Sequence, residues 1–280
     1  MPFDYAIHSD ILIHWTGKDL DCRLDPHWWE NDKSLTCHNP QLDDLYLERL
    51  LNILKYGIWL TNEPSKTYNM NSKNSFTLPS VNRVCFTELK VSQSRVHAKA
   101  YGRLGIGVKR PFVFEREGRP VSYFGYPSVL PNDKFLHHCI DSFSDKNFLQ
   151  FFKPMNSTNS LNYDFYSESE WRIIESLNLF TEKKLLNPRD NNNIEENNFY
   201  NNLSQVGMNI LKSLLPLDGW LSMIILPSLS IKNKLNDPNH KIGTAIKTEI
   251  KKIKTSCCCA NNVEGGVMPI EFDLDVCRNF

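Results

Sequence analysis

Apolar runs separated by polar turns predict that short strands make up much of this chain. Compact apolar runs bounded by polar, glycine or proline residues are typical of buried strands. We therefore expect strands near residues 11–14, 83–87, 101–108, 112–115, 121–124, 170–174 and 220–226. The run from Trp220 to Leu226 lies between Gly219 and Pro227 and predicts a strand that is buried on both faces.

Helical spacing is clearest between Leu42 and Lys55. Acidic residues stand near the start of this segment and Lys55 stands near its end, as the helix dipole favours, and Gly57 follows as a candidate cap. Residues 93–100 also have a helix-compatible composition, and the segment 231–254 is lysine-rich and partly helical in pattern. A basic helix face of this kind either contacts phosphates or is simply solvated.

Two segments have too little apolar content to predict packed structure. Residues 62–80 are rich in Asn, Ser and Lys, and residues 187–202 are dominated by Asn, so we expect these to be the most mobile parts of the chain. The fold class predicted is α+β, with a single domain over residues 1–280. Its core covers about residues 8–230, with an Asn-rich insertion at 187–202 and a basic extension at 231–280.

Composition narrows the class of protein. Lysine and arginine together number 32, and aspartate and glutamate together also number 32, so the net charge does not favour binding to nucleic acid or to an anionic membrane. We expect a cytoplasmic protein without a membrane partner, because no run reaches the length of a spanning helix and the start lacks a signal segment. Cys22, His27 and the pair Cys37-His38 lack the paired spacing of a zinc site, so we expect no metal.

Candidate chemistry lies at three places in the sequence. The first strand leads into His14, Thr16 and Gly17, and the segment 83–115 combines a strand ending at Thr87, a polar helix and a strand with three glycines. Glycines inside a strand mark either a close approach of a ligand or plain relief of crowding. The third place is the late strand with Glu168 and Glu170, which either serve a site or pair with Arg172 or lysines across the sheet.

Four runs of the sequence, HWTGKDLD, ILKYG, CFTELK and YGRLGIGVKRPF, resemble the AbiGi family of bacterial abortive-infection (phage-resistance) proteins. The resemblance extends to about residue 230. It implies an anti-phage role and a partner protein encoded in the same defence operon, because members are described as the antitoxin of a two-gene system.

The order of these pieces also looks, more distantly, like an ADP-ribosyltransferase fold, which is a curved, split sheet flanked by helices. That resemblance implies NAD as a substrate. It implies that His14 holds the nicotinamide ribose, that Thr16 and Gly17 meet the nicotinamide amide, and that Thr87 or Tyr101 belongs to the second motif. The sequence Cys-Phe-Thr-Glu at residues 85–88 departs from that motif's usual Ser-Thr-Ser.

The same resemblance makes Glu170 the catalytic carboxylate. Glu168 shares its strand face, so we expect one of the two carboxylates to stay ionised while the other orients a nucleophile. Arg103, Lys109 and Arg110 are the candidates to meet the pyrophosphate, because no glycine-rich phosphate loop of the usual spacing is present. Cleavage of the nicotinamide–ribose bond develops positive charge on the ribose, which a nearby carboxylate stabilises. Two functions stay open. The first is an enzyme that uses NAD to modify a nucleic acid or protein acceptor, and the second is a non-catalytic antitoxin or sensor that acts by binding a protein.

Overall fold

The computed structural model describes residues 10–21, 40–71, 74–88, 94–126, 146–156, 169–187, 213–256 and 268–276. Within these residues the chain is an α+β protein with seven α-helices and a mixed eight-stranded sheet. The predicted α+β class is therefore confirmed. No helix of the described residues is both long enough and apolar enough to cross a membrane.

The chain divides into two compact units. Unit 1 comprises Met1–Ile58, Phe86–Glu115 and Leu214–Phe280, and unit 2 comprises Trp59–Cys85 and Arg116–Ser213. The strands β2 (Ile58–Trp59) and β6 (Val81–Thr87) contribute residues to both units.

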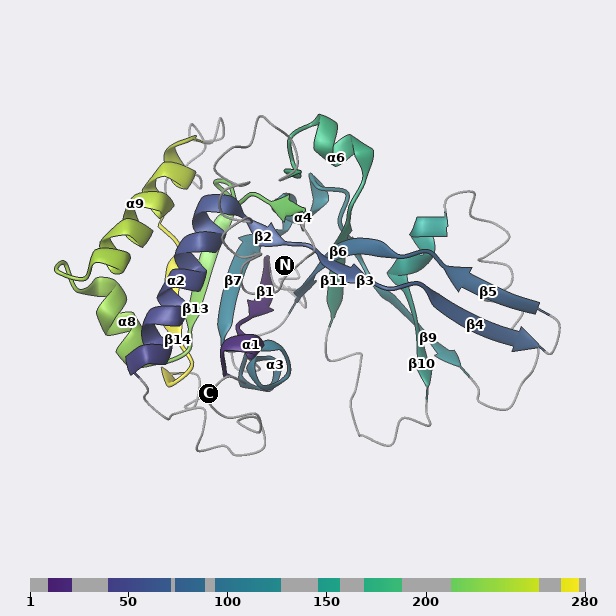
Figure 1. The fold of residues 1–280 in the computed structure, drawn as a ribbon, viewed down its shortest axis with the longest axis horizontal. Helices are drawn as coiled ribbons and strands as arrows, with labels where there is room; N and C mark the ends of the chain where they lie inside the picture. The colour runs from purple at the N-terminus through teal and green to yellow at the C-terminus, as the bar shows by residue number, and fades with distance from the viewer. Residues whose placement is uncertain are drawn as a thin grey trace, which may run out of the picture. The chain divides into compact units, whose positions relative to one another are not determined.

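Unit 1 is built on a sheet whose strand order is β14-β13-β7-β1-β6. Its elements are β1 (Ile11–Thr16), α1 (Lys18–Asp21), α2 (Pro40–Tyr56), α3 (Ser94–Tyr101), β7 (Leu104–Lys109), α4 (Arg110–Phe114), β12 (Leu214–Leu215), β13 (Leu221–Leu226), α8 (Leu229–Asn236), α9 (Lys241–Ser256) and β14 (Ile270–Asp273). β7 is antiparallel to both β1 and β13, whereas β13 and β14 are parallel (Figure 1).

The helices of unit 1 form where the sequence predicts them. α2 covers the predicted segment from Leu42 to Lys55, and Gly57 follows it with φ +106 while its N–H donates to Ile53 O at 2.9 Å. α3 packs on β1, where Ala98 joins a buried cluster with Trp15 and Met223. α2, α8 and α9 pack against one another beside β13 and β14 (Figure 1). The basic segment after residue 230 therefore supplies two helices of unit 1.

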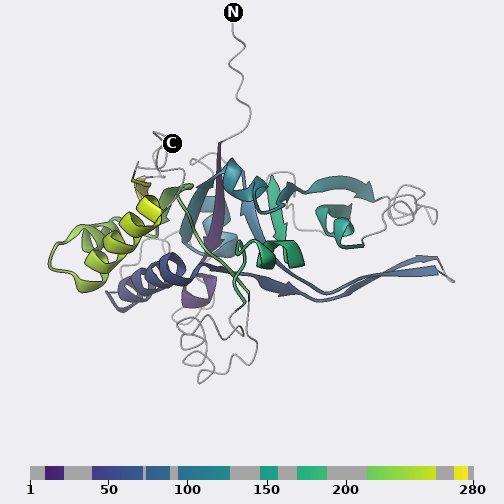
Figure 2. The ribbon, with the colours of Figure 1, turned by 90° about the horizontal axis from the view of Figure 1, so that it is seen from above.

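Unit 2 contains the first five residues of β6 in the order β6-β11-β8, with β3 paired to β6. Its elements are β3 (Thr61–Glu63), β4 (Lys66–Asn71), β5 (Asn74–Leu78), β8 (Arg119–Pro120), β9 (Ser122–Tyr126), the 3₁₀ helix η4 (Lys146–Phe151), β10 (Phe152–Asn156), β11 (Glu170–Ile174) and α6 (Leu177–Thr181). β4 and β5 run side by side as a two-stranded hairpin, which Figure 2 shows along its length.

Two local predictions are wrong. Residues 62–80 were expected to be a mobile loop, but they hold β3, β4 and β5. Despite the high Asn and Ser content, polar and apolar residues alternate on either side of residues 72–73, with Tyr68 and Met70 before them and Phe76 and Leu78 after them. This alternation is the pattern of a hairpin.

Residues 112–115 were expected to be a strand, but Arg110–Phe114 is the helix α4. Pro111 fits the first turn of a helix because it has no N–H to leave unpaired. The adjacent residues Phe112 and Val113 are both buried, which the alternating faces of a strand do not favour. The expected strand at 101–108 also begins later, at Leu104, because Tyr101 ends α3. Residues 188–202 of the Asn-rich segment lie outside the described residues.

The glycines of β7 leave room for the strands on either side. A Cβ at Gly107 would lie 2.6 Å from Met223 Cβ on β13 and 3.0 Å from Ile11 Cγ2 on β1. A Cβ at Gly105 would lie 3.1 Å from both Ile13 Cγ2 and Ile225 Cβ. Of the two interpretations of these glycines, relief of crowding between strands is therefore the one that the contacts support.

We expect Gly107→Ala to lower the free energy of unfolding by about 1–3 kcal/mol, the usual cost of overpacking a core. Met223 must shift, and this outweighs the gain of about 0.5–1 kcal/mol that alanine brings to a strand interior through backbone entropy. Gly105→Ala is the matched control and should cost less, since its nearest contacts are longer. Urea unfolding of both variants measures the difference, and a Gly107→Ala variant as stable as the original chain would refute the packing argument.

Candidate functional site

The end of β1 in unit 1 holds two of the predicted NAD-binding residues. Thr16 is the last residue of β1, and its Oγ1 accepts a hydrogen bond from Arg49 Nη1 at 3.3 Å. Arg49 also forms a bidentate pair with Asp19, at 3.1 and 2.6 Å. The Thr16 hydroxyl is thus already held by a side chain of α2.

Tyr46 connects this corner to Arg103. Its hydroxyl donates to Gly17 O at 3.2 Å, and Arg103 Cζ lies 5.5 Å from the centroid of its ring, within the range of a cation–π contact. Arg103 is buried, and Gly102 before it has φ +115, where a Cβ would collide with Lys18 N and Thr16 O. The fold therefore brings Thr16, Gly17 and Arg103 together at one corner of unit 1.

The other predicted residues of unit 1 lie at separate positions. His14 is half-buried in the middle of β1, with its ring centroid 5.9 Å from that of Phe86. Thr87 is buried at the end of β6, where its Oγ1 accepts from Trp15 Nε1 and donates to Ile13 O, both at 3.2 Å. Tyr101 ends α3, is exposed, and lies 5.8 Å from the ring of His97. The Thr87 hydroxyl thus joins β6 to β1.

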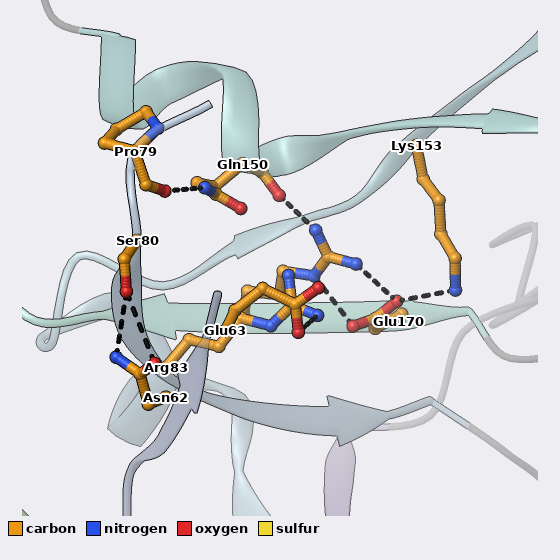
Figure 3. A network of polar contacts seen from close by, with 9 residues as sticks. Asn62, Glu63, Pro79, Ser80, Arg83, Gln150, Lys153 and Glu170 are labelled. Carbon is orange, nitrogen blue, oxygen red and sulfur yellow. Dashed lines mark hydrogen bonds and ion pairs between the residues drawn. The ribbon is translucent and has the colours of Figure 1, made fainter. Parts of the chain in front are cut away.

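Glu170 begins β11 in unit 2 and is buried in a bidentate ion pair. Arg172 donates from Nε to Glu170 Oε1 at 2.7 Å and from Nη2 to Oε2 at 3.0 Å. The two side chains share a strand face because they are two residues apart. Arg172 Nη1 also donates to Gln150 O, and Lys153 Nζ lies 3.5 Å from Glu170 Oε2, as Figure 3 shows for Lys153 and Glu170.

These contacts keep Glu170 ionised. Burial on its own raises the pKa of a carboxyl group, but the hydrogen bonds and charge of Arg172, with smaller effects from Cys85 and Lys153, lower the pKa of Glu170 to about 2. Burial likewise lowers the pKa of Arg172, yet its hydrogen bonds to Glu170 and the carboxylate charge raise it overall. The pair is therefore charged throughout the physiological pH range.

Cys85 on β6 is the thiol that contacts this pair. Burial and the negative charge of Glu170 raise the pKa of Cys85 to about 12, and its thiol hydrogen-bonds to Glu170. A thiolate is the reactive form of cysteine, so Cys85 is held in its unreactive form at neutral pH.

Hydrogen bonds between neighbouring segments surround the pair in unit 2 (Figure 3). Arg83 Nη2 donates to Glu63 Oε2 at 2.9 Å across the β3–β6 pairing, and Gln150 Nε2 donates to Pro79 O at 3.0 Å. These partly buried hydrogen bonds connect β3 to β6 and η4 to the segment between β5 and β6, and such connections favour one packing arrangement.

The predicted site residues thus divide between the units. His14, Thr16, Gly17, Thr87, Tyr101 and Arg103 belong to unit 1, Glu170 belongs to unit 2, and Glu168 lies outside the described residues. The convergence of His14 and Glu170 on one pocket stays a prediction. The pairing of Glu170 with Arg172, which was one of the two interpretations of this strand, is what the contacts support.

Sequence reasoning missed several partners. Arg49 and Tyr46 stand on α2, about thirty residues beyond the groups that they contact, and Lys153 and Cys85 reach Glu170 from separate strands. Glu170-x-Arg172 was the one local signal, because alternate residues of a strand lie on the same face.

An open cavity of about 500 Å³ lies in unit 1 beside α8, lined by Leu229, Ser230, Asn233, Lys234 and Asp237. None of the predicted site residues lines it. Within the described ranges, no three His, Cys, Asp or Glu side chains cluster closely enough to hold a metal ion. Cys22, His27, Cys37 and His38 lie outside those ranges.

No protein-family model, curated protein or solved structure matches this chain. The resemblance to the AbiGi family therefore stays a prediction from the sequence.

We expect Glu170→Gln to lower the free energy of unfolding by about 3 kcal/mol, because it leaves the buried Arg172 charge without its counter-charge. The same substitution at an exposed carboxylate on a strand edge would cost far less, so the large expected loss follows from the burial of Glu170. Chemical denaturation measures the loss.

Two variants control this test. Glu182→Gln removes an exposed partner of Lys184 and should cost about 1 kcal/mol or less. Glu170→Leu combined with Arg172→Met removes both charges and should recover much of the lost stability, since apolar replacement of a whole buried pair is often neutral. If Glu170→Gln proves no more costly than Glu182→Gln, the buried pair does not stabilise unit 2.

The lowered pKa of Glu170 also predicts an acid dependence of stability. A carboxyl whose pKa falls on folding contributes stability above its unfolded pKa, near 4.5, and loses it as pH drops toward the folded pKa of about 2. The expected loss is about 3 kcal/mol across this window, at 1.36 kcal/mol per pKa unit. Thermal unfolding between pH 6 and pH 2 should show a shallower pH dependence in Glu170→Gln, and identical slopes in the two proteins would exclude Glu170 as the source.

Proposed function

We propose that this chain is a bacterial anti-phage protein that acts by binding a protein partner, as an antitoxin or sensor, rather than by catalysis. The sequence resemblance supplies the anti-phage part of the proposal. The state of the Glu170 carboxylate supports the non-catalytic part, because Arg172 engages both of its oxygens and Lys153 lies beside one of them.

An enzyme that cleaves NAD needs a carboxylate free to face the ribose as positive charge develops. The Glu170 carboxylate is already neutralised by the two hydrogen bonds from Arg172, so its charge would stabilise a positive ribose only weakly. The hydroxyls of Thr16 and Thr87 are similarly engaged by Arg49, Trp15 and the backbone. These groups hold the fold together and leave recognition to the protein surface.

ADP-ribosyl transfer is the second candidate function, and one observation favours it. Thr16, Gly17 and Arg103 do gather at one corner of unit 1, as a nicotinamide-binding corner followed by a phosphate contact would require. This function requires the finer fold proposal as well, a curved, split sheet of the ADP-ribosyltransferase type. Its acceptor would be a nucleic acid or a protein.

His14→Gln separates the two functions. Glu170→Gln does not, since loss of stability and loss of chemistry would look alike. In the binding function, the purified chain releases no nicotinamide from labelled NAD, and His14→Gln protects cells from phage as well as the original chain does. In the transferase function, the original chain releases nicotinamide and His14→Gln slows this by about a hundredfold, the usual effect of losing one preorganised polar contact.

Two further measurements complete the experiment. His240→Gln serves as a matched control in the same unit, because His240 precedes α9 and is not one of the predicted site residues, and melting temperatures check that each variant folds. Mixing the chain with the purified product of the adjacent gene should give a stable complex by light scattering after size-exclusion chromatography. Nicotinamide release that depends on His14 would overturn the binding function.

A further inference from the structure

The outward face of α9 carries lysines and threonines but no carboxylate. Ile246, Ile250 and Ile253 are buried on the inner face. The opposite face, read at 100° per residue, holds the exposed residues Lys241, Thr244, Thr248, Lys251, Lys252 and Thr255, and the half-buried Lys247 lies at its edge. We call these residues the α9 lysine face. Glu249, the one acidic residue of α9, lies to the side of it.

Most lysines of this face form no ion pair with another described residue. Lys252 pairs with Glu249 at 2.8 Å, but Lys241, Lys247 and Lys251 make no ion pair or side-chain hydrogen bond to another described residue. This differs from α8, where Lys234 pairs with Asp43 and Asp44, and from Lys254, whose Nζ donates to Gly219 O. Three charges therefore stay available on one side of one helix.

The threonines beside them have their hydroxyl hydrogens in use. Thr244 donates to Pro238 O, Thr248 donates to Thr244 O, and Thr255 donates to Lys251 O. The lysine ammonium groups are consequently the donors that this face offers. Point charges without a planar donor fork suit phosphate better than base edges.

The charge of α9 contrasts with the rest of the chain. The helix has five lysines and one glutamate, whereas the whole chain has equal numbers of basic and acidic residues. The face is also rigid, because α9 packs on α2 and α8. From Lys241 to Lys251 it extends about 15 Å at 1.5 Å per residue.

Double-stranded DNA fits this face best. A duplex presents one negative charge per about 1.7 Å of its axis, so lysines spread over about 15 Å of the helix can each meet a different phosphate. A duplex is already rigid, so only the lysine side chains lose conformational entropy on binding, whereas a flexible single strand would have to be ordered as well. No aromatic residue stands on the face to stack with unpaired bases.

We propose that the α9 lysine face binds the phosphate backbone of double-stranded DNA without sequence preference, through Lys241, Lys247 and Lys251. This goes beyond the proposed protein-binding function and does not depend on it. Neutralising three phosphates gives a slope of about −2.7 for the logarithm of the binding constant against the logarithm of salt concentration.

The test uses the full chain and fluorescent 20-base-pair duplexes of two unrelated sequences, by anisotropy from 25 to 200 mM salt. The original chain should bind both duplexes equally, with the slope given above. The triple variant Lys241→Gln, Lys247→Gln and Lys251→Gln should bind at least about tenfold more weakly at the lowest salt, with a slope near zero. The variant Lys55→Gln, Lys183→Gln and Lys184→Gln has the same change in net charge and should behave like the original chain.

Several outcomes would overturn the proposal. These are no binding at 25 mM salt, equal weakening by the two triple variants, or tighter binding to single-stranded DNA or to duplex RNA than to duplex DNA. Binding of polyglutamate in place of DNA would assign the face to an acidic protein instead. Melting temperatures of both triple variants show whether a loss of binding reflects unfolding.

Discussion

A buried carboxylate must keep its counter-charge, and this constraint governs unit 2. Glu170 and Arg172 stand on one face of β11, and neither charge reaches water easily. Arg172 also anchors the backbone at Gln150, while Lys153 and Cys85 approach the carboxylate from β10 and β6. One ion pair thus connects three strands and the 3₁₀ helix of unit 2, and burial together with the Glu170 charge raises the pKa of Cys85.

Unit 1 depends on a different constraint, which is space rather than charge. β7 lies between β1 and β13, and the side chains of those two strands occupy the room that β-carbons at Gly105 and Gly107 would need. The same close packing recurs at Gly102, where the turn into β7 lies directly against the end of β1. The gathering of Thr16, Gly17 and Arg103 at that corner follows from this packing, whatever binds there.

These two constraints bear on function in opposite ways. The buried polar groups of Glu170 and Thr87 are paired internally and contribute to stability and to a single packing arrangement. Where charge is exposed and lacks an internal partner, as on the α9 lysine face, it remains available to a partner molecule. This division favours recognition through the surface of unit 1 over catalysis at the Glu170 carboxylate.

The sequence by itself determined the elements with strong periodicity, because their signals are local. The helix at Leu42–Lys55, the strands at 11–14, 170–174 and 220–226 and the helical segment after residue 230 all follow from the spacing of apolar residues and their flanking caps. The hairpin β4–β5 was not predicted from the sequence, because its high Asn and Ser content outweighed a weak alternation of polar and apolar residues. The helix α4 was not predicted either, because a short apolar run outweighed the signal of a proline in the first helical turn. Only the tertiary structure decided what the candidate residues do. Whether Glu170 faces a substrate or Arg172, and whether Thr16 is open or held by Arg49, depends on burial and on partners distant in sequence, which no local spacing encodes.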